Sequence, residues 1–164
     1  MSSVYVRNRK ESKWEPIIFS EKMQDEFLDF AKRNFGIKDI KQLVRKKYIS
    51  GKFDSDDYEF YFSILREHRR TIYQILILLR DDLYSANVYP VTMSDFEQRL
   101  QYQNFALVHC SMLDKELQDV VTMFDVDINT FERYQAMIDR EIDLIKRWRQ
   151  RDNRLKARLK PGNV

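Results

Sequence analysis

The feature that most constrains this chain is a run of 32 residues, 56–87, that contains neither glycine nor proline. Its apolar residues recur at helical spacing: Tyr58, Tyr61, Phe62, Leu65, Ile72, Ile75, Leu76 and Leu79. That spacing predicts an α-helix with one apolar face, and the helix should end before the Tyr89-Pro90 pair. The whole chain of 164 residues has only three glycines and three prolines, so we expect long helices in the rest of it as well.

Two further long helices are predicted downstream, each with a start signal. The sequence SDFE (residues 94–97) matches a capping box, in which Ser94 caps and Glu97 reaches back, and an apolar stripe continues to Phe124. The sequence NTFE (residues 129–132) matches a second capping box, and the stripe behind it continues to Leu159. Short links between these segments are typical of helices that lie side by side.

The N-terminal third is less regular. We expect Ser20 to cap a helix over residues 21–34 that ends at Phe35 and Gly36, and a short helix over residues 39–48. The predicted fold is all-α, an antiparallel four-helix bundle with an additional short helix between the first and second long helices. We expect one domain over residues 1–164, with a flexible basic arm at 1–15 and a flexible tail at 161–164.

Basic residues are concentrated at the two ends of the chain. The net charge is +3, but residues 1–15 carry +2 and residues 146–160 carry +7, so the remainder is acidic. The second stretch has basic residues on both flanks of its apolar stripe, namely Lys146, Arg147, Arg149, Arg151, Arg154, Lys156, Arg158 and Lys160. The negative end of the helix dipole accounts for two or three cations, not eight. We therefore expect this helix to bind a nucleic acid or another polyanion; the alternative is a solvated helix end.

The basic arm offers further candidates. RNRKESK near the N-terminus either joins the same binding face, through Arg9, Lys10 and Lys13, or is a disordered segment. Within the C-terminal helix, Trp148 continues the apolar stripe, whereas Asp152 falls where an apolar residue is expected. Because burying a lone carboxylate is costly, Asp152 is expected to pair with an arginine or with a helix end.

Motifs for catalysis or metal binding are missing from the pattern. The two histidines, His68 and His109, lack the Glu-x-x-His spacing of ferritin-like metal sites, and DVDIN at 125–129 lacks the later residues of an EF-hand. Cys110 directly follows His109, so on a helix the two point about 100° apart and cannot form a nucleophile–base pair; Cys110 is expected in the core. We expect no enzyme, no cofactor and no metal, although an enzyme with dispersed catalytic residues would leave no local signature.

Cysteine usage and hydropathy bear on the compartment. One cysteine excludes an internal disulfide framework and fits a reducing compartment. The apolar runs are shorter than the roughly 18 residues of a membrane span, and MSSVYVRNRK has no apolar signal region. These features predict a soluble cytoplasmic protein that does not enter a membrane.

Scattered positions over most of the chain resemble a known family. They are Arg9-Lys10-x-x-Lys13-x-Glu15, Ala86-Asn87, Arg99, Gln103, Ala106, Cys110, Leu113, and Ile145-x-x-Trp148 with Asp152. The pattern resembles the accessory variability determinants of diversity-generating retroelements, which are related to the four-helix proteins of ribosomal RNA intervening sequences. The chain departs from the shorter members at residues 35–57, and from their basic surface in its acidic body.

The resemblance implies a function as well as a fold. It implies a four-helix bundle that assembles as a ring-like homopentamer and binds a reverse transcriptase and its template RNA or cDNA, without catalysis of its own. The implied contact residues are Arg147, Arg149, Arg151 and Arg154.

A second hypothesis is an oligomeric structural or protein-interaction bundle of a phage or mobile element. Nine tyrosines and eleven phenylalanines exceed what one small core easily uses. Aromatic side chains nearly encircle one helix start, at Tyr58, Phe60, Tyr61 and Phe62. Part of that surface is therefore expected either to meet another subunit or partner or to form an unusually aromatic core.

Overall fold

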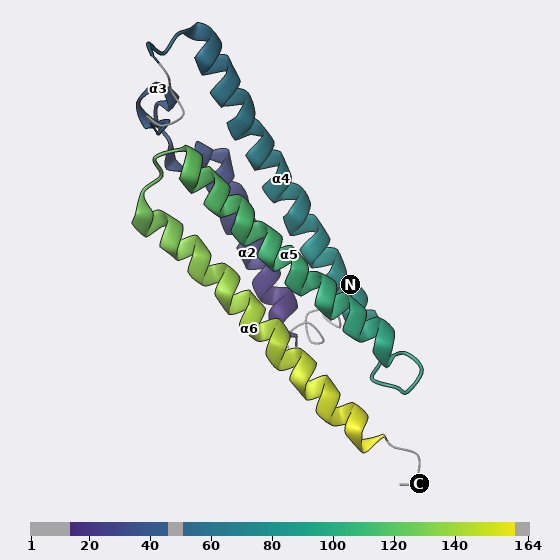
Figure 1. Ribbon diagram of the computed structural model, residues 1–164. Coiled ribbons are helices and arrows are strands. Elements are labelled where there is room, and N and C mark those ends of the chain that lie inside the picture. The colour runs from purple at the N-terminus through teal and green to yellow at the C-terminus, as the bar shows by residue number, and fades with distance from the viewer. Residues whose placement is uncertain (1–13, 46–50, 160–164) are drawn as a thin grey trace, which may run out of the picture.

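The computed structural model describes residues 14–45 and 51–159, and this part of the chain is helical (Figure 1). The long helices are α2 (Glu15–Lys32), α4 (Ser55–Val88), α5 (Phe96–Met123) and α6 (Ile128–Arg158). Helices α2 and α5 each contact both α4 and α6, so the four close around a common interior. Two short elements, η1 (Asn34–Gly36) and α3 (Ile40–Leu43), lie between α2 and α4 in the chain.

The predicted all-α class is confirmed. The described residues form no strand, only an isolated bridge between Val44 and Phe124. No helix among them is both long enough and apolar enough to cross a membrane. Residues 1–13 of the predicted arm, with Arg9, Lys10 and Lys13, lie outside the described ranges, as do the predicted tail at 161–164 and Lys160. The last two residues of the predicted arm, Trp14 and Glu15, instead form the start of α2.

The first helix begins earlier than predicted. Helix α2 starts at Glu15, with Trp14 as its N-cap residue and Pro16 in its first turn. A proline is tolerated there because its missing N–H would have no partner in the helix. Ser20 is therefore inside α2 and not its cap: its side chain is buried, and its hydroxyl donates to the Ile17 carbonyl over 2.7 Å. The predicted start of this helix is wrong by about one and a half turns.

Helix α2 ends through a left-handed turn, two residues before the predicted end. Asn34, Phe35 and Gly36 all have positive φ angles, of 53°, 56° and 78°. This region is costly for a side chain such as that of Phe35, but Phe35 is 1% exposed and packs edge-on against Phe30, with ring centroids 5.3 Å apart. Burial of the ring offsets the strain, so a phenylalanine occupies a position that would otherwise favour glycine.

Aspartates occupy the N-cap positions of α4, α5 and α6, and those of α4 and α6 cap through their side chains. Asp54 forms a capping box with Asp57 at the start of α4. Helix α5 follows Asp95, which makes no side-chain cap, and the Ser94 hydroxyl donates to the Asp95 carboxylate rather than accepting from the helix. Asp127 caps α6 by accepting from the Thr130 backbone N–H over 2.9 Å. Both predicted capping boxes, at 94–97 and at 129–132, are therefore wrong, because a nearby residue in each segment takes the cap position.

The short helix between α2 and α4 is a single turn. The prediction began this helix at residue 39, but Asp39 is its cap, accepting from the Lys41 N–H, and the helix ends at Leu43. Val44 is extended and pairs with Phe124, and the Arg45 N–H donates to the Met123 carbonyl over 3.1 Å. This contact with the end of α5 gives the Arg45 N–H a hydrogen-bond acceptor in place of the one that a continued helix would have provided. The predicted end of the helix lies outside the described ranges.

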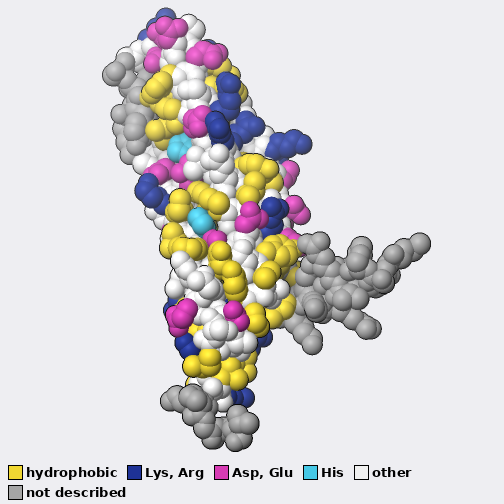
Figure 2. Space-filling model, turned by 90° about the vertical axis from the view of Figure 1, so that its right-hand side faces the viewer, with side chains coloured by type: hydrophobic (Ala, Val, Ile, Leu, Met, Phe, Trp, Pro, Cys, Tyr) yellow, Lys and Arg dark blue, Asp and Glu magenta, His cyan; other side chains and the backbone are white. Residues whose placement is uncertain are grey.

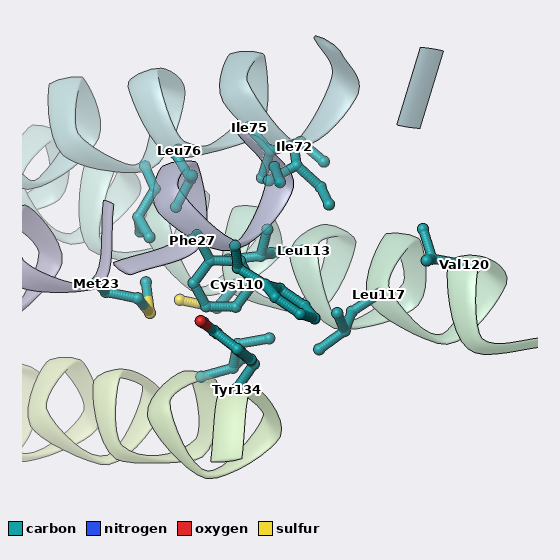
Figure 3. Close-up of a cluster of buried hydrophobic side chains, with 14 of the residues drawn as sticks. Met23, Phe27, Ile72, Ile75, Leu76, Cys110, Leu113, Leu117, Val120 and Tyr134 are labelled. Atoms are coloured by element: carbon teal, nitrogen blue, oxygen red, sulfur yellow. The ribbon is translucent and has the colours of Figure 1, made fainter. Parts of the chain in front are cut away.

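All four long helices contribute to the interior (Figure 3). Met23 and Phe27 of α2, Ile72 of α4, Cys110 of α5 and Tyr134 of α6 are each 0–2% exposed. The expectation that Cys110 is a core residue is confirmed. Each large apolar side chain buried in this way contributes about 1.5–3 kcal/mol relative to exposure.

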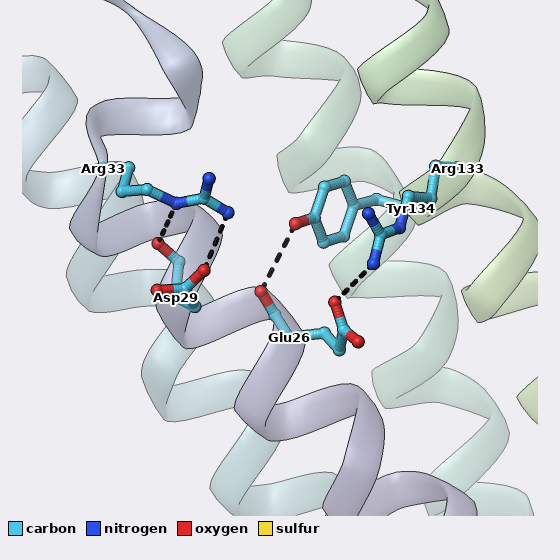
Figure 4. Close-up of polar contacts among 5 residues, drawn as sticks. All are labelled: Glu26, Asp29, Arg33, Arg133 and Tyr134. Carbon is cyan, nitrogen blue, oxygen red and sulfur yellow. Dashed lines mark hydrogen bonds and ion pairs between the residues drawn. The ribbon is translucent and has the colours of Figure 1, made fainter.

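Polar contacts join α2 and α6 at the edge of the core (Figure 4). Arg133 donates to the Glu26 carboxylate over 2.7 Å, and the Tyr134 hydroxyl to the Glu26 carbonyl over 3.5 Å. The Tyr134 ring lies flat against Phe30, with centroids 4.0 Å apart. These contacts fix the side of α6 that faces α2, and with it the direction in which the C-terminal half of α6 presents its arginines.

Candidate nucleic-acid interface

A buried ion pair anchors the C-terminal half of α6. Asp152 is 1% exposed, and its Oδ2 accepts from Arg99 Nε over 2.6 Å and from Gln103 Nε2 over 2.7 Å. Arg99 also donates from Nη1 to the Ala86 carbonyl, over 2.8 Å, and to the Tyr89 carbonyl, over 2.6 Å. The prediction that Asp152 pairs with an arginine is confirmed. Since Arg99 also satisfies carbonyls at the C-terminal end of α4, one side chain ties α4, α5 and α6 together.

The two tryptophans of the chain enclose this arginine. The Arg99 guanidinium carbon lies 4.9 Å from the centre of the Trp148 ring and 5.1 Å from that of Trp14, and the two ring centroids are 5.0 Å apart. On the solvent side, the guanidinium carbon of Arg151 lies 4.8 Å from the Trp14 ring. Each cation–π contact contributes about 0.5–2 kcal/mol. Together they attach the start of α2 to the basic part of α6.

Four arginines form a row along one flank of α6, which we call the arginine row: Arg147, Arg151, Arg154 and Arg158. Their spacing of four, three and four residues keeps them on one face, and the row is about 16 Å long. All four are exposed, and none makes a hydrogen bond or ion pair with another described residue. Their guanidinium groups are therefore available to an external anion, except that Arg151 rests on Trp14.

The remaining basic residues of α6 have different surroundings. Arg149 donates to Asn104 Oδ1 over 2.7 Å. Lys156 pairs with Glu97 over 2.7 Å and lies 4.1 Å from the centre of the Phe96 ring. These two face α5 and are engaged in the bundle. Lys146 is exposed. It precedes Trp148 by two residues, so it lies about 160° around the helix from that ring and away from the arginine row.

The histidines pair with carboxylates across α4 and α5, on a face where apolar side chains also gather (Figure 2). His68 Nδ1 lies 2.6 Å from Glu116 Oε1, and His109 Nδ1 lies 2.6 Å from Asp82 Oδ2. Burial raises the pKa of Asp82, an effect that the contact with His109 opposes. The described residues contain no group of three or more ligands that could hold a metal. No local sequence pattern indicates these pairs, because each joins residues from two helices.

Cys110 and Glu141 are buried ionisable groups away from the Arg99–Asp152 pair. Burial raises the pKa of the Cys110 thiol, which keeps it protonated. Glu141 is 0% exposed, neither of its oxygens has a partner among the described residues, and burial raises its pKa well above the usual range. A carboxyl group in this setting is held in its neutral form. No sequence pattern distinguishes Glu141 from the other charged residues of α6, so its burial was not predicted.

Comparisons with family models, with curated proteins and with solved structures found no match to this chain.

Proposed function

We propose that this chain is a non-enzymatic nucleic-acid-binding accessory protein that works with a reverse transcriptase and binds its template RNA or cDNA. The observation that carries the proposal is the arginine row: four exposed guanidinium groups on one flank, with no carboxylate partner in the described part of the chain. In an ordinary solvated helix, acidic side chains one turn away would share such a surface. Here Asp152 is the one acidic residue between 146 and 160, and it is buried against Arg99.

The rest of the proposal concerns architecture and assembly. We take the four helices to run antiparallel in sequence order, with α3 as the additional short helix; the crossed pairing of His68 with Glu116 and of Asp82 with His109 supports this for α4 and α5. The protein acts in the cytoplasm without cofactor or metal, as a homo-oligomer, which is a pentamer in the ring that the resemblance implies. The family resemblance is the ground for the reverse transcriptase and for the ring.

The test is fluorescence anisotropy of a labelled structured RNA titrated with the protein, between about 50 and 300 mM salt. The test variant reverses the charge of the three row members that make no hydrogen bond, ion pair or cation–π contact within the described residues, namely Arg147, Arg154 and Arg158. The control variant makes the same change of charge at exposed positions elsewhere, namely Lys22, Lys52 and Arg70. Both variants should keep the wild-type helix content, since these side chains make no hydrogen bond or ion pair within the described residues.

We expect salt-sensitive binding that the row variant loses and the control variant retains. Each phosphate contact on a single strand contributes about 0.7 to the slope of log K against log salt, so loss of three contacts should flatten the slope by about 2. Equal losses in both variants would show that only net charge matters and would remove the row as a site. Absence of binding by the wild type at low salt would reject nucleic-acid binding.

A second candidate function, an oligomeric structural or interaction bundle, is favoured by exposed apolar side chains. Phe105, Val108 and Met112 of α5 are 42–53% exposed, and their spacing puts them on one face. Of the aromatic cluster at the start of α4, Tyr61 is buried, whereas Phe60 is 59% exposed. Sedimentation velocity at micromolar concentration tests it: a Val108→Glu/Met112→Glu variant should sediment as a smaller species than the wild type. Identical sedimentation would reject this surface as an interface.

A further inference from the structure

A pocket of about 200 Å³ lies between the first turn of α2 and the basic half of α6. Residues of both helices line it, namely Trp14, Glu15, Pro16, Leu144, Arg147, Trp148 and Arg151. Both tryptophans of the chain and two members of the arginine row therefore border one small space. The ligand that we infer for this space makes the proposed function more specific, and the inference rests on that proposed function.

The pocket is bordered by a polar group that lacks a partner. Trp148 is 4% exposed, and its indole Nε1 donates to no acceptor among the described residues. In the cluster behind the ring, Arg99 Nη2 and Asp152 Oδ1 are also buried without a described partner. A buried donor without an acceptor is unfavourable, so a bound group that brings oxygen or nitrogen acceptors would stabilise this cluster.

The cations at the rim are arranged for phosphate. Arg151 stacks on the Trp14 ring, and a stacked guanidinium keeps its in-plane N–H groups available for a bidentate contact. Arg147 lies one turn earlier on the same flank, about 6 Å along the axis. The stack limits the rotamers of Arg151, so less side-chain freedom is lost when an anion binds.

The lining also suits a planar heterocycle better than a bare anion. Aromatic side chains beside arginines are the combination that holds the bases and backbone of single strands. Glu15, which lies 3.8 Å from Arg140 and is mostly exposed, would repel a second phosphate but can accept from the N–H group of a base. A base in a perfect duplex is already stacked and paired, and so cannot enter.

We propose that this pocket seats one unpaired nucleotide of a bound strand, with its base in the space that the tryptophans line and its phosphate on Arg147 and Arg151. The arginine row then follows the backbone on toward Arg158. The protein should consequently prefer single-stranded or looped nucleic acid to duplex.

Intrinsic fluorescence reports directly on the site, since the chain has only two tryptophans and both line the pocket. The probes are a thymidine strand of about twelve nucleotides, an abasic strand of the same length and charge, and a duplex of the same length. Thymidine monophosphate is the fourth probe and represents a free nucleotide. Tryptophan quenching measures occupancy of the pocket, and anisotropy of end-labelled strands measures binding as a whole.

We expect the thymidine strand to bind at least about fivefold more tightly than the abasic strand and to quench tryptophan emission. The abasic strand and the duplex should bind by anisotropy without quenching. A Trp14→Leu variant that keeps the wild-type helix content should bind the thymidine and abasic strands equally.

Three outcomes would overturn the inference. Equal binding of the thymidine and abasic strands without quenching would reject the pocket and leave the arginine row intact. Tighter binding of thymidine monophosphate than of the strand would make the ligand a free nucleotide. No anisotropy change with any strand at low salt would reject nucleic-acid binding itself, so the two proposals fail in distinguishable ways.

Discussion

Replacing Asp152 by asparagine tests whether the Arg99–Asp152 pair holds the basic half of α6 in place. The substitution keeps the size of the side chain and one acceptor oxygen but removes the charge. Arg99, whose side chain is 3% exposed, would then be a buried cation whose described hydrogen-bond acceptors are two backbone carbonyls and an amide oxygen. Removing one partner of a buried pair costs about 3–5 kcal/mol, and we expect the lower end, about 3 kcal/mol, because those carbonyls remain.

The measurement is urea unfolding followed by circular dichroism. A loss of about 3 kcal/mol is a large share of the 5–15 kcal/mol that stabilises a typical domain, so the midpoint should fall clearly while the variant still folds. The matched control is Asp119→Asn, since Asp119 pairs with Lys115 over 2.7 Å but is 46% exposed, and such pairs contribute about 0–1 kcal/mol.

A double-mutant cycle separates the pair from its surroundings. Arg99→Met combined with Asp152→Leu replaces both charges by apolar groups, and it should cost at least about 1.5 kcal/mol less than the sum of the two single changes. A cost below about 1 kcal/mol for Asp152→Asn, or strict additivity in the cycle, would refute the reasoning that Arg99 depends on this carboxylate.

Three other predictions concern single residues. Glu141→Gln should stabilise the protein at neutral pH. The Glu141 carboxyl group binds a proton more tightly in the folded state, so wild-type stability should fall as the pH rises above 4.5, by at most about 1.4 kcal/mol per pH unit. A plot of urea midpoint against pH should therefore be flatter for the variant than for the wild type. Asp54→Ala should cost about 1 kcal/mol by removing the α4 cap, whereas Ser94→Ala should be nearly neutral in the same assay. Cys110 should resist an aromatic disulfide reagent in the native protein and react fully in urea; fast native labelling would contradict its burial.

Much of the fold could be predicted from the sequence because the relevant signals are local. Apolar spacing and the scarcity of helix breakers are enough to place α4, α5 and α6 within a few residues. The cap residues were harder to predict, because several candidate side chains lie within a few positions of each helix start and small differences in free energy select among them. Ser20 is a cap in the sequence pattern but lies inside α2, because Pro16 is compatible with a first turn and leaves the helix free to start earlier.

The candidate site likewise has some features that local sequence specifies and others that depend on the packing of helices. The sequence by itself determined that α6 carries arginines along one flank and a carboxylate in its apolar stripe, because both follow from 3.6 residues per turn. Only the tertiary structure decided which cations stay available. Helix α5 engages Arg149 and Lys156, whereas Trp14 of the α2 start supports Arg151 without neutralising it. The physical reason is that availability depends on the neighbouring helix, and no local pattern specifies which side chains that helix brings.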